Sequence, residues 1–149
     1  MKAICLSDIH GNDVKYRKLC GYIKQTLPDV VFIAGDVLPN YYVTEPLEFI
    51  DDTLKPLLSD LKEEMKQAYP DIFLITGNDD AAVSCEHLRY LELKGLIHFA
   101  NKLVMDQKGY TVLGYPYVPP TPFLLKDWEK YDVSRYLPRD TVSPEDGIR

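Results

Sequence analysis

Three short apolar runs, each followed by a polar turn, constrain the fold of this chain more than any other feature. Residues 3–6, 30–34 and 72–76 are rich in apolar and β-branched side chains that do not alternate with polar ones. Such runs are typical of strands buried on both faces, as in a parallel sheet. Each run stops at a turn that carries an acidic residue or an asparagine. The pattern predicts three buried strands with polar side chains at their carboxyl ends.

Helical patterns fill the segments between these runs. Residues 12–27 place apolar side chains on one face, and Asn12 or Asp13 is suited to cap the start of this helix. Residues 45–68 carry apolar side chains at three- and four-residue steps, and Pro56 predicts a kink or a break in this second helix. Strands that alternate with helices predict an α/β fold with βαβ units and a mainly parallel sheet.

The pattern changes in the second half of the chain. Residues 84–94 predict a third helix, which stops near Gly95. Three short strands are predicted after it, over residues 96–99, 102–105 and 110–115, and a turn joins the last two. This part of the sequence predicts a small antiparallel addition to the parallel sheet.

The last part of the chain is rich in proline and has no clear period. A short helix is predicted near residues 125–131, and the final residues are expected to be extended. We therefore divide the chain into an α/β domain over residues 1–118 and a proline-rich, partly extended C-terminal segment over residues 119–149.

The charge of the chain argues against two classes of partner. The chain has 149 residues and a formal net charge of −6, whereas phosphate backbones and anionic lipid surfaces attract basic proteins. We therefore expect no general nucleic-acid binding and no membrane binding. An anionic substrate remains compatible with this charge, because carboxylates can bind divalent cations that in turn bind phosphate.

Cysteine usage and the N-terminus predict the compartment. Cys5, Cys20 and Cys85 show no CxxC spacing, so we expect buried free thiols and a reducing environment. The N-terminal apolar run is too short for a signal peptide, and no window approaches the length of a membrane span. The sequence therefore predicts a cytoplasmic protein.

Polar residues that follow the three buried strands are candidates for a metal site. In a parallel α/β sheet the carboxyl ends of the strands share one edge, where ligands bind. The side chains that this arrangement would gather are Asp8, His10, Asp36, Asn78, Asp79 and Asp80. Crowded carboxylates repel one another, so a cation is expected among them. Carboxylate, amide and imidazole donors without thiolates suit Mn²⁺, Fe, Zn²⁺ or Mg²⁺ and argue against a structural zinc site.

The order of these motifs resembles the opening part of the calcineurin-like metallophosphoesterase family. The motifs that carry the resemblance are Asp8-x-His10, Gly35-Asp36 and Gly77-Asn78-x-Asp80. The resemblance covers about residues 1–115 and implies the first part of a metallophosphoesterase-type β-sandwich flanked by helices. It also implies that Asp8 and His10 bind one metal ion, that Asp36 bridges two ions, and that Asn78 binds the second.

The resemblance further implies a reaction and its cofactors. The reaction is metal-assisted hydrolysis of a phosphoester substrate. The complete family site holds two divalent ions, for which we expect Mn²⁺, with Fe, Zn²⁺, Mg²⁺ and Ni²⁺ as alternatives.

Two departures from the family pattern bear on activity. Many members have a histidine after the asparagine of the third motif, where this chain has Asp79. An aspartate beside cations should stay ionised and is a poor general acid. Asp79 and Asp80 are nevertheless the predicted catalytic positions. The later Gly-His motifs of the family supply three more ligands, whereas the histidines of this chain are His10, His87 and His98. We expect His87 to be a surface residue and His98 a structural one.

These observations predict a phosphatase or phosphodiesterase of this family whose chain is truncated or partial and whose intrinsic activity is low. Two alternatives stay open. One is a catalytically silent metal-binding or interaction protein derived from the same fold, and the other is a site completed by histidines of a partner chain. An exposed sheet edge or the C-terminal segment is expected to support a homo-oligomer.

Overall fold

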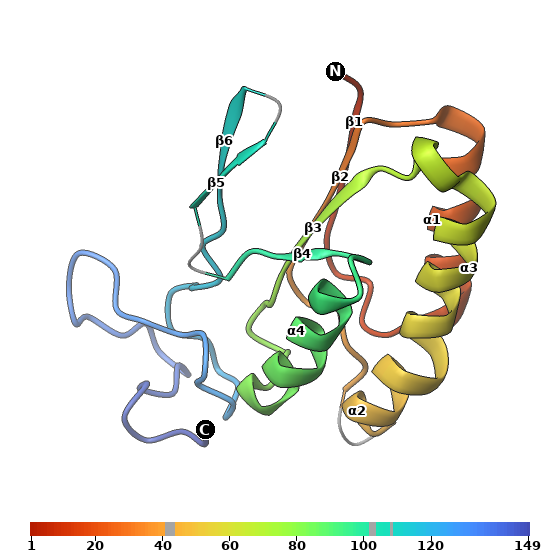
Figure 1. Cartoon of the computed structure of the whole chain (residues 1–149). Coiled ribbons are helices and arrows are strands. Elements are labelled where there is room, and N and C mark those ends of the chain that lie inside the picture. Colours follow the sequence, from red (N-terminus) through yellow and green to blue (C-terminus); the bar gives the residue numbers. More distant parts are fainter. Residues whose placement is uncertain (41–43, 102–103, 108) are drawn as a thin grey trace.

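A four-stranded parallel sheet lies at the centre of the fold (Figure 1). A computed structural model describes residues 1–40, 44–101, 104–107 and 109–149 of the chain. The strands, in their order across the sheet, are β1 (Ala3–Leu6), β2 (Val30–Ala34), β3 (Asp71–Ile75) and β4 (His98–Phe99). The predicted α/β fold with a mainly parallel sheet is confirmed.

Helices and helical turns connect these strands. Their bounds are α1 (Asp13–Thr26), α2 (Pro46–Phe49), η1 (Ile50–Leu54), α3 (Lys55–Met65), η2 (Lys66–Ala68), η3 (Ala82–Ser84) and α4 (Cys85–Leu93). The predicted break near Pro56 takes the form of η1, a π-helical turn, because proline lacks the N–H that would bond to the carbonyl of Asp52. None of the described helices has the length and apolar character needed to cross a membrane.

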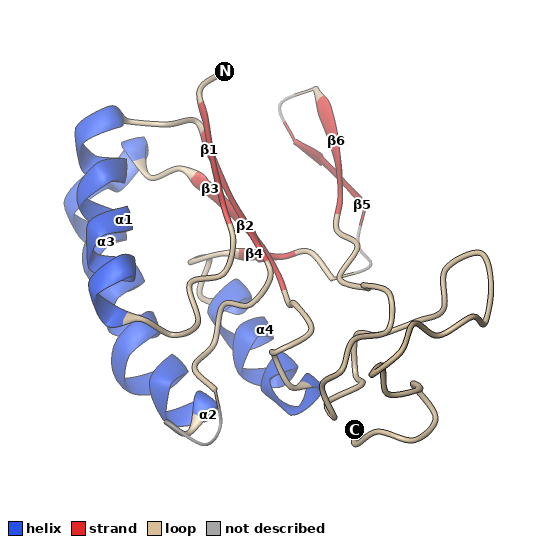
Figure 2. Cartoon of the chain, turned by 180° about the vertical axis from the view of Figure 1, so that it is seen from behind, coloured by secondary structure: helices blue, strands red, loops and turns tan. Residues whose placement is uncertain are grey.

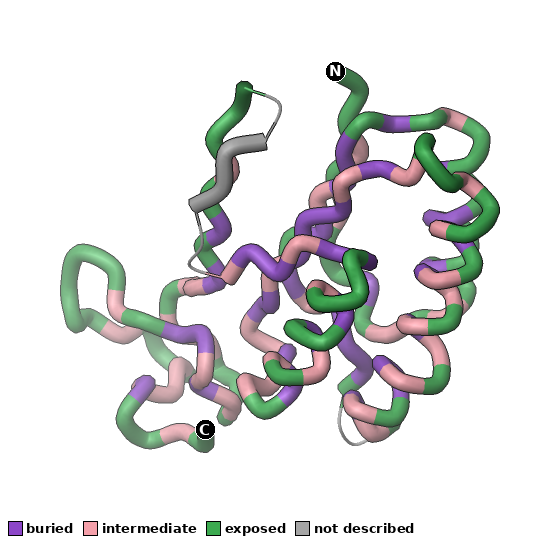
Figure 3. Tube along the Cα trace, in the orientation of Figure 1, coloured by how far each residue is buried: buried purple, intermediate pink, exposed green. Residues whose placement is uncertain are grey.

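The two faces of the sheet have different surroundings (Figure 2). Successive residues of a strand point to opposite faces. On one face, Val31 and Leu74 belong to the main core together with buried residues of α1, α3 and α4. On the other face, Val30 and Phe73 belong to a smaller cluster that includes the partly buried Val112. Figure 3 shows buried residues along the sheet and on the inward sides of the helices. The main core therefore lies between the sheet and its helices.

Strand β1 corrects the prediction that every strand is buried on both faces. Ala3 and Cys5 are exposed, because the helices cover the opposite face of the sheet. Cys20 is buried and Cys85 is half-buried, and all three thiols are free. The expectation of buried thiols therefore holds fully for Cys20 and is wrong for Cys5.

A separate antiparallel hairpin follows the sheet. It consists of β5 (Val104–Gln107) and β6 (Tyr110–Leu113), in which Gln107 pairs with Tyr110. Both strands differ by a few residues from the predicted ranges 102–105 and 110–115, of which residues 102 and 103 lie outside the described part of the chain. Strand β6 ends before Gly114, where an added Cβ would lie 2.6 Å from the carbonyl carbon of Ala100. The absence of a side chain at Gly114 therefore lets the backbone pass close to Ala100, the residue that follows β4.

The C-terminal segment contains no helix at residues 125–131, so that prediction is wrong. Val118 instead pairs with Glu129, and Leu125 pairs with Ile148, each through an isolated bridge. The turn between these bridges is fixed by an ion pair of 2.5 Å between Lys126 Nζ and Glu129 Oε2, both of which are buried. Long-range backbone pairing therefore replaces the local hydrogen bonds of a helix in this segment.

Candidate metal centre

The loops that follow β1 and β2 run side by side at the carboxyl edge of the sheet. The backbone N–H of Asp8 donates to the carbonyl of Gly35 at 3.2 Å, and that of His10 donates to the carbonyl of Asp36 at 2.8 Å. These bonds continue the parallel pairing of the two strands beyond their ends. Between the two candidate ligands of the first loop, Ile9 is buried and anchors the loop in the core. The first two motifs are therefore held in register with each other.

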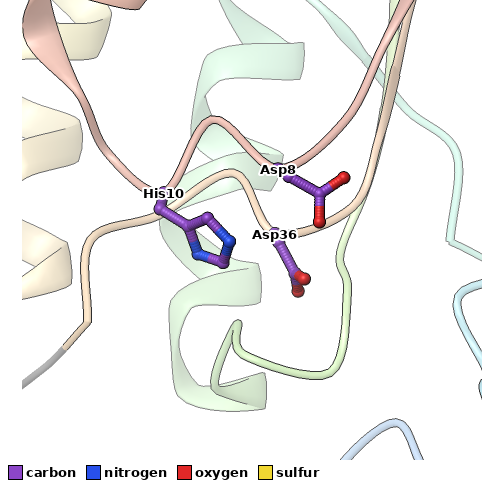
Figure 4. Close-up of side chains that lie close together, drawn as sticks. All are labelled: Asp8, His10 and Asp36. Atoms are coloured by element: carbon purple, nitrogen blue, oxygen red, sulfur yellow. The ribbon is translucent and has the colours of Figure 1, made fainter.

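Three side chains of these loops come together (Figure 4). One ligand atom from each of Asp8, His10 and Asp36 lies within 4.8 Å of the others. Asp8 and His10 are exposed and Asp36 is half-buried, so the group is open to solvent. Two carboxylates and an imidazole form a donor set that suits Mn²⁺, Fe, Zn²⁺ or Mg²⁺. The residues present thus fit a divalent cation.

The same three residues have unusual backbone conformations. Their φ angles are +57° for Asp8, +51° for His10 and +50° for Asp36. Few residues other than glycine adopt this left-handed region, and the strain is tolerated where the surroundings impose it. Here the backbone bonds between the two loops supply that constraint. Strain at all three donors is a further indication of a functional site.

The loop after β3 reaches the same edge. The backbone N–H of Asp79 donates to Asp36 Oδ1 at 3.0 Å, and Asp79 Oδ2 lies 3.4 Å from His10 Nδ1. Asn78 directly precedes Asp79 and is half-buried. The third motif therefore meets the first two, as expected from its position at a strand end. The ligand roles predicted for Asp8, His10, Asp36 and Asn78 stay predictions.

Asp80 joins the second and third loops from below the surface. Its side chain is fully buried and accepts hydrogen bonds from the backbone N–H groups of Val37, Leu38 and Gly77, at 2.8 to 3.1 Å. Burial raises the pKa of Asp80 to about 6, against the opposite effect of these N–H donors. A carboxylate in this place holds the two loops together, and the catalytic roles expected for Asp79 and Asp80 stay predictions.

Two residues of the C-terminal segment also reach the third loop, and sequence reasoning missed both. The indole N–H of Trp128 donates to the carbonyl of Asp80 at 2.6 Å. Asp127 Oδ2 accepts from the backbone N–H of Ala82 at 2.7 Å. The available signal in the sequence was weak, namely the single tryptophan of the chain beside an aspartate in a segment without period.

The other two histidines lie elsewhere. His87 is in α4, with its Nε2 at 3.9 Å from Asp51 Oδ2. His98 is in β4, where its ring stacks on Phe73 and its Nε2 lies 3.3 Å from Asp71 Oδ1. Neither belongs to the three-residue group around Asp36. The position of His98 against Phe73 agrees with the structural role expected for it, whereas His87 is half-buried and less exposed than the surface position expected for it.

Gly77 provides the first test of this packing. A Cβ at residue 77 would lie 2.8 Å from Cγ of Asp36 and closer still to its Oδ1. We expect Gly77→Ala to weaken Mn²⁺ binding about tenfold or more, because a displaced ligand loses its geometry, and to lower stability by about 1–3 kcal/mol. Calorimetric titration and chemical denaturation measure the two effects.

Gly21 gives the matched control. It lies in α1, where an added Cβ would meet no atom within 4 Å. Gly21→Ala is expected to raise stability by about 0.5–1 kcal/mol and to leave Mn²⁺ binding unchanged. If Gly77→Ala bound Mn²⁺ as tightly as the wild type, the role given to this glycine would be wrong.

Comparison with known proteins identifies the family. A model of the calcineurin-like phosphoesterase family matches residues 1–147. A search of curated proteins found no match. One crystal structure is similar over 72% of this chain and 49% of the other, with 17% sequence identity and a TM-score of 0.49. The chain thus spans about half the length of that structure. Because the family model covers nearly every residue, the chain belongs to the calcineurin-like phosphoesterase family.

Proposed function

We propose that this chain hydrolyses phosphoesters with the help of a divalent ion held by Asp8, His10 and Asp36. The observation that carries the proposal is the convergence of these three donors within 4.8 Å at the end of a parallel sheet. Membership of a phosphoesterase family supports the reaction class. A bound divalent ion would supply Lewis-acid activation of water and of the phosphoryl group.

The residues of this site have different roles toward a substrate. His10 and Asp8 face solvent, so a phosphoester can approach them from outside. The contact between Asp79 Oδ2 and His10 Nδ1 supports a positioning role for Asp79, because a carboxylate on one ring nitrogen orients the other toward a ligand. We assign Asp79 this role in place of proton donation to the leaving group.

We infer that the activity is low, because few ligands are predicted for a second metal ion. Asp36 and Asn78 are the ligands that the sequence predicts for a second ion, and the histidines other than His10 lie in α4 and β4. With two donors a second ion would be held loosely. The alternative function is that of a catalytically silent metal-binding protein of the same fold. The small number of donors for a second ion also favours this alternative.

A titration and an activity assay on the same preparation test the proposal. We expect calorimetry to detect one weak Mn²⁺ site, and turnover of a generic aryl phosphodiester with added Mn²⁺ to stay below about 1 s⁻¹, the lower end of common enzyme rates. Binding without any turnover would favour the silent protein. Binding of two ions with high affinity, or turnover well above this rate, would contradict the partial site.

The cellular location and the oligomeric state stay predictions. Strand β1 lies at one edge of the four-stranded sheet, and this edge is a candidate surface for self-association. Light scattering of the purified chain would measure the assembly directly, and we expect a species larger than the monomer.

A further inference from the structure

The C-terminal segment forms two hydrogen bonds with the loop that follows β3 at the metal centre. Trp128 donates its indole N–H to the carbonyl of Asp80 at 2.6 Å, and its side chain is only 7% exposed. Asp127 accepts from the backbone N–H of Ala82 at 2.7 Å, at the start of η3. One contact uses a carbonyl and the other an N–H two residues later. Together they fix both the position and the orientation of the loop backbone.

The same loop backbone continues directly into the metal centre. The Asp80 carboxylate accepts from Gly77 N–H and from the loop after β2. The backbone N–H of Asp79 donates to Asp36 Oδ1. A shift of the loop at Asp80 therefore changes the placement of Asp36 through this continuous series of hydrogen bonds. Trp128 contacts the backbone carbonyl of Asp80 and not its carboxylate, so it acts on the site through the loop backbone.

The turn that carries Asp127 and Trp128 is held by a buried ion pair. Lys126 and Glu129 flank Asp127 and Trp128 in the sequence and form an ion pair with each other. Lys126 is 0% exposed and Glu129 is 2% exposed. Thr121 completes the pair, since its carbonyl accepts from Lys126 Nζ and its backbone N–H donates to Glu129 Oε2. A buried ion pair with its remaining hydrogen bonds satisfied holds a single geometry. The C-terminal segment thus presents Asp127 and Trp128 on a fixed turn.

We propose that Asp127 and Trp128 are positioning residues of the metal centre, which tune its affinity for a divalent ion by fixing the loop that holds Asp36 in place. The inference rests on the proposed function, because it presupposes ion binding at Asp36. It assigns the proline-rich segment a role in the chemistry of the site, where its composition alone indicates only a partly extended tail.

Three variants of the full chain, each titrated with Mn²⁺ in a calorimeter, test the proposal. Trp128→Phe keeps an aromatic ring beside Tyr117 but removes the indole N–H. We expect it to weaken Mn²⁺ binding about fivefold, the effect of one lost hydrogen bond. Asp127→Ala should have an effect of similar size, and Asp127→Asn should restore most of the affinity, because its amide oxygen can still accept from Ala82.

A control separates this role from general support of the fold. The Tyr131 hydroxyl lies 2.7 Å from Glu145 Oε2 and 3.4 Å from Ser143 Oγ, both within the C-terminal segment, so Tyr131→Phe also removes side-chain hydrogen bonding from the segment. We expect Tyr131→Phe to bind Mn²⁺ like the wild type. Circular dichroism and thermal unfolding of each variant show whether it is folded at the titration temperature.

Three results would overturn the inference, and they are distinguishable. If the wild type binds Mn²⁺ and folded Trp128→Phe and Asp127→Ala bind it equally well, the positioning role is wrong while the proposed function stands. An equal loss of affinity in Tyr131→Phe would also reject it, because any damage to the segment would then suffice. If the wild type binds no Mn²⁺, the proposed function itself fails, and this inference fails with it.

Discussion

Asp36→Ala is expected to abolish detectable Mn²⁺ binding, the largest effect on the site of any single substitution. Asp36 contributes a ligand atom within 4.8 Å of those of Asp8 and His10. Removing it leaves one carboxylate and one exposed imidazole. Loss of a residue that merely supports a ligand already costs about 10–100-fold in affinity, so loss of the ligand should cost at least about 100-fold. Any slow phosphodiester turnover should disappear at the same time.

Asp36→Asn and Asp52→Ala sharpen this experiment. The amide keeps the size of the side chain and can still accept from the backbone N–H of Asp79, so folding should be little affected. Its lower charge should nevertheless weaken Mn²⁺ binding strongly. Asp52 is an exposed carboxylate in η1, and its removal should leave Mn²⁺ binding unchanged. Wild-type affinity in Asp36→Ala would place the ion elsewhere and refute the proposed centre.

The backbone of this fold is well predicted from the sequence where the signal is local. The apolar runs at residues 3–6 and 30–34 coincide with β1 and β2. The burial of each strand face could not be predicted in the same way, because an apolar run does not show which elements pack against it. Cys5 is exposed for this reason, although its neighbours in sequence resemble those of a buried strand. The C-terminal segment is harder still, since its two bridges join residues that no periodic pattern relates.

In the candidate site, too, some features could be predicted from the sequence and others could not. The donors Asp8, His10 and Asp36 follow strands, so the rule that parallel strands end at one edge predicts their convergence, which the structure contains. The hydrogen bonds of Asp80 could not be predicted because two of its three donors, Val37 and Leu38, are more than 40 residues away. The contact from Trp128 spans 48 residues. Only a structure brings such partners together, and these partners decide how firmly the donors are held.

Asp80→Asn is expected to destabilise the folded chain more than any other substitution of a single polar atom in the loops. The carboxylate accepts from three backbone N–H groups and has no exposed surface. An asparagine would offer one oxygen and turn an NH₂ group toward a donor, so at least one buried N–H would lose its partner. Hydrogen bonds to a charged acceptor contribute about 1.5–3 kcal/mol each. We therefore expect stability to fall by about 3 kcal/mol, which chemical denaturation would measure.

Asp79→Asn is the matched control for this prediction, because it makes the same chemical change one residue earlier. The Asp79 side chain is half-exposed, and its contact with His10 is long, at 3.4 Å. Substitutions at such positions usually change stability by less than about 0.5 kcal/mol. A large difference between the two variants would show that burial and the three N–H donors, not the acidic character of the loop, account for the effect. Equal stability of Asp80→Asn and the wild type would mean that the loops after β2 and β3 are held together without this carboxylate.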